Sequence, residues 1–388
     1  MTQTKVEAPF VEGGGGSSFK NLLINGDMQI WQRGTAATAA TSAYVGVDRW
    51  KILENSEGAI TAEQSALSTA DKATTGCRNA LLIKCTTTDT SIGSGQYSYI
   101  SQALEGQFLS HLAWGTTSAK TLTLSFWVKA YVAATYTIFI KKYDNTDYYI
   151  PIEYAVNSSN TWEKKTIVIS PTSGSTSLIT GANGAFDQDN GIALLLGFGL
   201  TWGSTYHGTS GTWSSSSHFS TSNQTNFLSS TDNTFYLTGV QLEVGDQATD
   251  LEQVPFDVQL HRCQRYYENG FDTGYYPAAD VNYDNMANTF QATCYAVDTL
   301  RCMIPFKTRK RTVPAVVTYR VDGLGDGSGD SGRWDMYDSG QGNWQQMDGT
   351  TSTGEATEYG VDLNFVDTNF ELQESFIVAG GWEADAEI

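Results

Sequence analysis

The sequence predicts an all-β protein in which two β-sandwich domains are joined by a short helix. Its 388 residues include 38 glycines, which favour frequent turns over long helices. Aromatic residues make up 12% of the chain and charged residues 17%, a balance typical of strands that bury one face. We expect four segments: a flexible arm over residues 1–20, a large domain over 21–254, a linking helix over 255–270 and a smaller domain over 271–388.

Alternating apolar and polar residues predict the strands of the large domain. Between residues 121 and 129 the apolar side chains fall on one face: Leu122, Leu124, Phe126 and Val128. Further strands are predicted at 136–141, 148–150, 166–169, 192–198 and 235–242, and a turn at 144–147 closes a hairpin. The run 192–198 is apolar on both faces, so we expect it near the middle of a sheet.

Two glycines mark expected irregularities. The closing strand carries two apolar pairs of opposite parity, Phe235 with Leu237 and Val240 with Leu242. A β-bulge at Gly239 would return both pairs to the core. At the start of the domain an apolar run is interrupted at residues 25–27, so we expect a first edge strand that turns sharply at Gly26.

Residues 203–230 form a long segment rich in Gly, Ser, Thr and Asn that also contains Tyr206 and Trp213. Long loops of this kind are often functional. Aromatic rings stack on sugar faces while neighbouring hydroxyls and amides bind sugar oxygens, so Tyr206 and Trp213 are candidate ligand-binding residues. The alternative is a loop that is packed by its own aromatic side chains or against a neighbouring subunit.

The linking helix is predicted from one apolar stripe over residues 255–268. Its members recur at helical spacing: Phe256, Leu260, Cys263 and Tyr267. A short helix is marginal alone, so the stripe must pack against something. It either docks on a sheet of the same subunit or forms the oligomer interface of three copies around a threefold axis.

The C-terminal domain is predicted as a smaller β-sandwich with strands at 289–296, 302–306, 315–319 and 375–380. Its loops gather candidate ligand-binding residues: Trp334, Asp335, Tyr337, Asp338, Asn343 and Trp344. The alternative is that these aromatics pack the loop or a subunit contact. Asp322, Asp326 and Asp330 miss the alternating ligand spacing of a calcium-binding loop, so the sequence supports neither a structural calcium ion nor another metal or cofactor.

Charge and motifs exclude several function classes. The net charge of −19 argues against nucleic acid as a partner, and no apolar run is long enough to span a membrane. The five cysteines show no CxxC spacing; we expect buried thiols, with Cys77 and Cys85 as one plausible pair. No nucleophile, zinc-protease or phosphate-binding motif is present, so we expect no enzymatic activity.

Three stretches carry a resemblance to a known family. They are residues 21–35 together with 48–50, residues 235–245 followed by 263–267, and residues 379–388. In this order and spacing they resemble a family of tailed-phage virion proteins, described as tail-fibre or minor structural proteins. The first stretch also resembles the carbohydrate-binding-module jelly rolls, whose first strand often reads Asn-Leu-x-x-Asn-Gly-x-Phe-Glu. Here Met28 and Gln29 occupy the last two positions. The neutral amide of Gln29 therefore stands where those modules have the carboxylate that helps to hold calcium.

The resemblance implies a jelly roll for residues 21–254 and a place in the virion after synthesis in the host cytoplasm. It implies a homotrimeric tail fibre or appendage that contacts the host surface, with the C-terminal domain as its receptor-binding tip. A host surface glycan or an outer-membrane protein would be the target, and residues 1–20 would attach to another virion protein. The alternatives are a capsid decoration or head-fibre protein, and a glycan-depolymerising tailspike enzyme.

Overall fold

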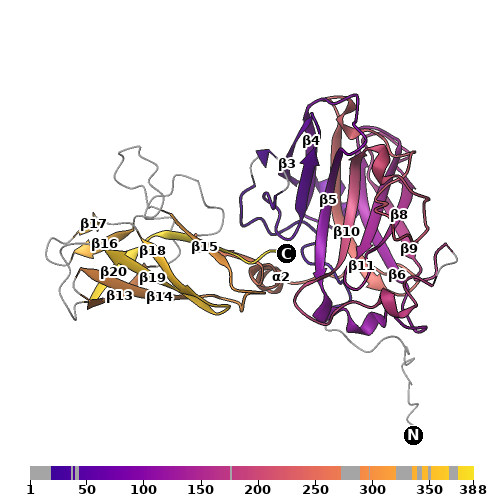
Figure 1. Cartoon of the computed structure of the whole chain (residues 1–388). Helices are drawn as coiled ribbons and strands as arrows, with labels where there is room; N and C mark the ends of the chain where they lie inside the picture. The colour runs from indigo at the N-terminus through magenta and orange to yellow at the C-terminus, as the bar shows by residue number, and fades with distance from the viewer. Residues whose placement is uncertain are drawn as a thin grey trace, which may run out of the picture.

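The computed structural model contains two β-lobes joined by the helix α2 (Phe256–Gln264), as Figure 1 shows. It describes residues 19–35, 38–39, 43–174, 177–271, 289–296, 298–319, 334–338, 343–347, 351–366 and 375–388. The described elements are almost all antiparallel strands, which confirms the all-β prediction. No helix in this described part is both long and apolar enough to cross a membrane.

The larger lobe is a jelly-roll sandwich of two antiparallel sheets. One sheet has the order β1 (Thr38–Ala39), β3 (Ala59–Ala66), β4 (Asn79–Thr87), β11 (Thr234–Val244), β6 (Leu122–Ala130) and β9 (Glu163–Ile169). The other has the order β2 (Lys51–Asn55), β5 (Tyr97–Glu105), β10 (Ile192–Trp202), β7 (Thr135–Lys142) and β8 (Tyr148–Ala155). Strand β10 lies in the middle of its sheet, as its two apolar faces predict, and β7 and β8 form the predicted hairpin.

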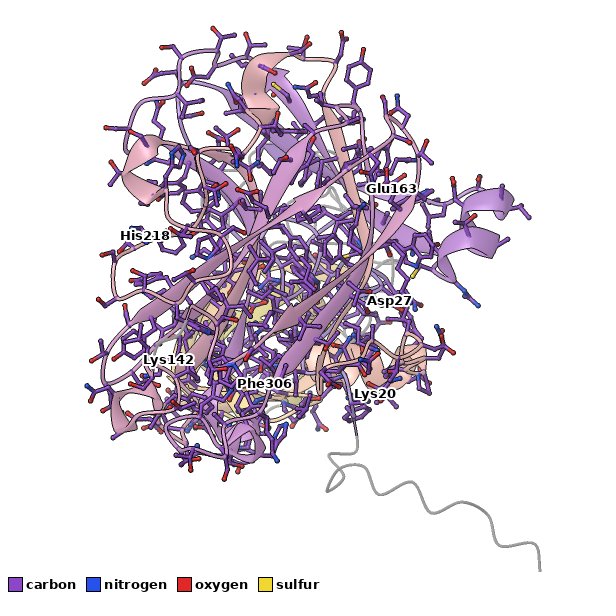
Figure 2. All side chains as sticks on the ribbon, turned by 90° about the vertical axis from the view of Figure 1, so that its right-hand side faces the viewer. Lys20, Asp27, Lys142, Glu163, His218 and Phe306 are labelled. Atoms are coloured by element: carbon purple, nitrogen blue, oxygen red, sulfur yellow. The ribbon has the colours of Figure 1, made fainter. Side chains whose placement is uncertain are left out.

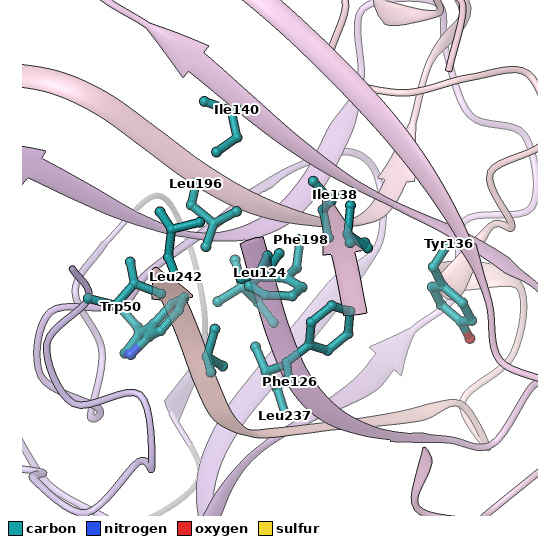
Figure 3. Packing of buried hydrophobic residues seen from close by; sticks show 14 of the residues in the cluster. Trp50, Leu124, Phe126, Tyr136, Ile138, Ile140, Leu196, Phe198, Leu237 and Leu242 are labelled. Carbon is teal, nitrogen blue, oxygen red and sulfur yellow. The ribbon is translucent and has the colours of Figure 1, made fainter. Parts of the chain in front are cut away.

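Apolar side chains from both sheets meet in one core, part of which is seen in Figure 3. The predicted alternation in β6 is confirmed, because its four apolar residues all point into this core and are fully buried. Phe126 lies edge-on to Phe198 of the opposite sheet, with ring centroids 5.0 Å apart. Burial of each such side chain contributes about 1.5–3 kcal/mol to stability.

The predicted β-bulge in β11 is also confirmed. Gly239 has φ +61°, and the register with β6 shifts between Thr238 and Gln241. The apolar pairs on either side of the bulge are both fully buried. A left-handed backbone position of this kind favours glycine, which explains why the parity of the strand changes there.

The expectation of an edge strand turning at Gly26 is wrong. Residues 21–31 contain no strand, and the positive φ angles fall on Asn25 (+58°) and Met28 (+57°). Gly26 serves a close approach instead, because an added Cβ would lie 2.0 Å from the carbonyl oxygen of Val240. The Asn25 side chain holds this turn by donating to the carbonyls of Ile30 and Asp48.

One short helix was not anticipated, and the disulfide alternative is not realised. Helix α1 (Thr69–Thr75) begins where the Ser68 side chain accepts from the backbone N–H of Asp71 and ends at Gly76 with φ +73°. Both are ordinary helix boundaries. The seven-residue helix between them has no apolar stripe, so the sequence pattern does not predict it. All five cysteines are free and buried, which confirms the expectation of buried thiols.

The smaller lobe is a second antiparallel sandwich. Its three-stranded sheet has the order β12 (Tyr267–Asn269), β21 (Gly381–Asp385) and β15 (Ala315–Tyr319). Its seven-stranded sheet has the order β17 (Asn343–Gln346), β16 (Asp335–Asp338), β20 (Ser375–Ala379), β13 (Thr289–Ala296), β14 (Thr299–Pro305), β19 (Gly360–Val366) and β18 (Ser352–Ala356). Side chains from both sheets share one apolar core.

The linking helix is shorter than predicted, and its stripe is divided. It ends at Gln264, because the chain enters β12 at Tyr267 and pairs with β21. Cys263 and Tyr267 are buried within the chain, whereas Phe256 is 47% exposed. A threefold contact through all four predicted residues is therefore wrong, since two of them already pack inside the subunit.

A network of buried charges joins the two lobes. Arg49 of the larger lobe forms an ion pair with Glu387 and lies over the ring of Tyr266, with its Cζ 3.3 Å from the ring centroid. Arg265 forms two hydrogen bonds with Glu105, at 2.9 and 2.8 Å. Burial, the largest single influence, lowers the pKa of Arg49, but Glu387 together with Tyr266 and Tyr44 outweighs it and raises that pKa, so the guanidinium stays charged.

A second part of this junction surrounds Arg33. Its guanidinium pairs with Asp385 at 3.1 Å and with Glu387 at 3.4 Å, and it lies 3.6 Å above the ring of Tyr267. Asp48, fully buried, accepts a hydrogen bond of 2.9 Å from the backbone N–H of Gln32. All three stretches that carry the family resemblance therefore contribute side chains to this one junction.

Candidate functional site

A layer of aromatic rings covers the outer face of the five-stranded sheet of the larger lobe. Two glycines of β10 make room for it: a Cβ at Gly197 would lie 2.2 Å from the Phe139 ring, and a Cβ at Gly199 would lie 2.6 Å from Nε1 of Trp202. Strand β10 thus presents backbone on its outer face and large apolar residues on its inner face. The rings of Phe139 and Trp202 fill the space that side chains would otherwise take.

The predicted loop at residues 203–230 folds back over this layer. Phe219 stacks on Trp202 with an interplanar angle of 1° and centroids 5.1 Å apart. It also meets Phe139 edge-on at 4.9 Å, and Ser214 pairs with Tyr149 through two backbone hydrogen bonds of 2.9 Å. Figure 2 places His218 of this loop on the same side of the sandwich as Lys142, opposite Glu163 and Asp27.

The rim of the layer is partly open to solvent. Tyr97, Tyr99 and Tyr206 are half-buried, whereas Trp202 beneath them is buried. Tyr99 stacks on Trp202 at 5.0 Å and 13°, and Tyr206 meets Tyr97 edge-on at 5.8 Å. The buried Trp202 thereby contacts and orients three half-buried rings.

A cation lies beside the same face. Nζ of Lys141 is 2.8 Å from the Asp147 carboxylate and 3.8 Å from the ring centroid of Tyr143. Burial disfavours its charged form, but the hydrogen bond to Asp147 and the neighbouring Tyr143 outweigh burial and raise the pKa of Lys141. The ammonium is therefore charged at neutral pH and supplies a donor next to the half-buried Tyr143.

Three tyrosine hydroxyls of this surface, those of Tyr99, Tyr143 and Tyr206, remain protonated. Burial raises the pKa of Tyr99, with a further contribution from Tyr97, and burial also raises the pKa of Tyr206 and Tyr143. At neutral pH these three phenols can therefore donate as well as accept a hydrogen bond. Neutral rings with hydroxyl tips suit a polyhydroxylated ligand with apolar faces.

The two candidate residues predicted in the 203–230 loop lie in different environments. Tyr206 belongs to the aromatic surface, defined here as Tyr97, Tyr99, Tyr143, Trp202 and Tyr206. Trp213 does not, because it is buried, donates from Nε1 to the carbonyl of Ser170 at 2.9 Å and packs edge-on against Trp114. The prediction that Trp213 stacks on a ligand is therefore wrong.

The predicted site in the smaller lobe is only partly assembled. Trp334 is fully buried against Phe290 and Phe365, and Asp335 is buried as well, so neither presents its side chain to a surface ligand. Packing inside the lobe, the alternative interpretation, holds for Trp334. Tyr337 and Trp344 are half-buried and meet edge-on at 5.6 Å across the β16–β17 pair.

The remaining predicted residues of this lobe have no described side chains. Asp338 and Asn343 are register partners of the same strand pair, and their side chains lie outside the described part. Asp322, Asp326 and Asp330 also lie outside the described residues. Within the described part of the chain, no group of three or more His, Cys, Asp or Glu side chains is arranged to hold a metal ion.

Sequence reasoning missed most of the aromatic surface. Its signal was available as a period-two pattern: Tyr97 and Tyr99 alternate with buried residues of β5, and Gly197 and Gly199 do so in β10. Gly199 opposes Tyr99 in β5 and Gly197 opposes Phe139 in β7, and small residues beside rings on one sheet face indicate space for those rings. The pairing of β5 with β10 was needed to bring the two patterns together.

No family model matches the chain, and no curated protein matches its sequence. Several solved structures are similar to this chain. One is the enzymatically active domain of tailspike protein 4 of bacteriophage CBA120, at 11% identity and a TM-score of 0.31. That match covers 59% of this chain and 22% of the tailspike chain.

Other similar structures are carbohydrate-binding modules. The family 11 module of the cellulase Lic26A-Cel5E of Clostridium thermocellum is 14% identical with a TM-score of 0.29, and the match covers 55% of this chain and 98% of the module. The xylan-binding CBM22-1 domain of Paenibacillus barcinonensis Xyn10C is 12% identical with a TM-score of 0.27, covering 56% and 99%. At these identities and TM-scores the likeness carries no functional information.

Proposed function

We propose that the chain is a non-enzymatic structural protein of a tailed-phage virion whose larger lobe binds glycans of the host surface. The observation that carries the glycan part is the aromatic surface. Half-buried rings held in place by a buried Trp202 offer apolar area that needs no further ordering when a ligand arrives. The phage part is supported by the resemblance of the three sequence stretches.

Binding would follow from the chemistry of the surface. Rings of Tyr99 and Tyr206 stack on the apolar faces of pyranose units, while protonated phenols exchange hydrogen bonds with sugar hydroxyls. Lys141 adds a cation, which favours glycans that carry a carboxylate or another acidic substituent over basic ones. The remaining charge of the molecule is negative, so a highly charged anionic polymer is disfavoured.

A binding role fits this surface better than catalysis. Glycoside hydrolysis requires two carboxyl groups flanking one bond, at most about 10 Å apart. Two carboxylates on this sheet face are already engaged, because Asp147 pairs with Lys141 and Glu153 accepts a hydrogen bond from Asn223. We therefore expect bound glycan to be recovered intact after prolonged incubation.

Glycan-array binding with purified full chain tests the proposal. Tyr99→Ala and Tyr206→Ala should each weaken binding about tenfold, the loss expected from about 1.4 kcal/mol of stacking. Tyr131→Ala is the matched control, because Tyr131 is 42% exposed and has no ring contact with the aromatic surface within the described residues. Unchanged affinity in both tyrosine variants, with the fold intact, would remove the glycan proposal.

The virion role has its own test. A homotrimer is expected from the resemblance, so light scattering should give three times the 42.3 kDa of one chain. A monomer at micromolar concentration would contradict it. A tail partner for residues 1–20 supports a fibre or appendage, whereas a shell partner supports the capsid decoration or head-fibre alternative.

A further inference from the structure

A pocket of about 380 Å³ opens between the larger lobe and helix α2. Its walls are mainly apolar, and they include Leu22, Leu104, Phe108 and Leu109. Phe108 is 53% exposed, a large amount for an aromatic residue on a soluble surface. The volume lies in the range of pockets that take a side chain or small molecule, and neither the aromatic surface nor the glycan proposal uses it.

Three arginines also line the pocket, and they are not equally neutralised. Arg49 and Arg265 each pair with a carboxylate, Glu387 and Glu105. Arg262 has no ion pair within the described part of the chain; its guanidinium lies 4.4 Å above the Phe19 ring and makes a 3.4 Å contact with the carbonyl of Leu23. The site therefore combines apolar walls with a cation that lacks a carboxylate.

A neighbouring hollow of about 350 Å³ continues this positive character. It shares Phe108 and Arg265 with the pocket and adds Arg309 and Arg311. Arg311 binds backbone carbonyls of Asn190, Ala386 and Glu387. Arg309 pairs with Glu358, so Arg311 is the arginine of this hollow without an ion pair in the described part of the chain. On a chain of net charge −19, Arg262 and Arg311 together favour an anionic group joined to an apolar one.

The described chain begins at the rim of the pocket. Phe19 is one of its lining residues, so the segment that precedes it starts there. That segment holds one apolar stretch, Val6-Glu7-Ala8-Pro9-Phe10-Val11-Glu12, followed by the spacer at 13–18. In an extended peptide Phe10 and Glu12 point to the same side. Six residues separate Glu12 from Phe19, and the seven steps of the chain between them reach at most about 25 Å.

We propose that residues 6–12 of the same chain occupy this pocket in the free protein, with Phe10 between the apolar walls and the Glu12 carboxylate on Arg262. A Gly-rich spacer holds the peptide near its site at an effective concentration of about millimolar, so a modest intrinsic affinity suffices. The inference is independent of the glycan proposal.

A photo-crosslinker tests the docking directly in the full chain. Phe10 is replaced by p-benzoylphenylalanine, and after irradiation the crosslinked peptides are mapped by mass spectrometry. The expected products join position 10 to residues 104–109 or 22–24. Mixing isotopically labelled with unlabelled protein separates contacts within one chain from contacts between two copies. The same crosslinker at Gln3 is the control and should give no enrichment at the pocket.

Charge exchange provides the second measurement. Arg262→Glu should lower the pocket crosslink by up to about tenfold, as should Glu12→Arg, and the double variant should restore it. Lys164→Glu, at an exposed position of β9, should leave the crosslink unchanged. Crosslinks that are absent, scattered over the surface or formed mainly between two copies would overturn the proposal, as would a double variant that stays as weak as the single ones.

Discussion

The core of the larger lobe and the junction between the lobes are both buried, yet they are built from opposite kinds of side chain. In the core, apolar residues such as Phe126 and Phe198 interlock without any charge. At the junction, Arg49 and Glu387 meet away from solvent. Apolar burial stabilises whatever its exact partners are, whereas a buried ion pair is favourable only when both members are in place. The core therefore supplies stability, and the junction fixes how the lobes sit.

The largest expected effect lies in the core. Phe126→Ala removes a fully buried ring and leaves a cavity between the two sheets. The free energy of unfolding of the larger lobe should fall by about 3–5 kcal/mol, measured by chemical denaturation. Added salt should not alter this loss, since no charge is involved. A cost below about 1 kcal/mol would show that the core is more loosely packed than the ring contacts indicate.

The junction should respond to pairs of changes rather than to single ones. Glu387→Ala leaves Arg49 buried without its carboxylate and should cost about 3 kcal/mol. Arg49→Met combined with Glu387→Met should cost less than the sum of the single changes, because no unpaired charge remains at that contact. Small-angle scattering should show a wider spread of lobe orientations in the single variants. Additive costs would mean that the two side chains do not interact.

A smaller effect is expected from pH, through Asp48. Burial raises the pKa of this carboxyl to about 6, although Arg33 and the hydrogen bonds from Gln32 favour its charged form. Because the folded pKa exceeds the unfolded value of about 4, the contribution of Asp48 to stability is full below pH 4 and is lost as pH rises through 6. That contribution amounts to about 3 kcal/mol.

An NMR titration of the Asp48 carboxyl carbon should give the midpoint, and Asp48→Asn is the reference variant. The stability of the wild-type protein relative to this variant should decrease between pH 4 and pH 6. A midpoint near 4 would mean that Arg33 and Gln32 outweigh burial at the junction.

The strands were predictable where the pattern is local. Alternation in β6 and the parity change at Gly239 each follow from neighbours a few residues apart, so the sequence alone locates the core face. The end of α2 was not predictable in this way. Tyr267 continues the helical stripe, but its pairing with Asp385, more than 100 residues away, places it in a strand.

The candidate site depended on such distant contacts even more. Trp213 and Trp334 lie among turn-forming residues, which suggests surface loops, and both fold inward to fill gaps that only the assembled sheets create. The aromatic surface arises from the register of β5, β7 and β10, which places Tyr99 and Phe139 beside glycines of the central strand. Tyr206 was found because it belongs to the one loop whose composition is locally unusual.

The ion pair between Arg49 and Glu387 joins residues 338 positions apart, which sets an order of events during synthesis. At about 5–20 residues per second, Arg49 is made roughly 20–70 seconds before its carboxylate exists. The jelly roll can fold on the ribosome within that interval. Arg49, at the side of the larger lobe that faces the junction, has no Glu387 to pair with until the last residues are made. The junction between the lobes is thus the last part of the described molecule to form. A nascent chain exposes the Arg49 side of the larger lobe to chaperones until the end of the smaller lobe emerges.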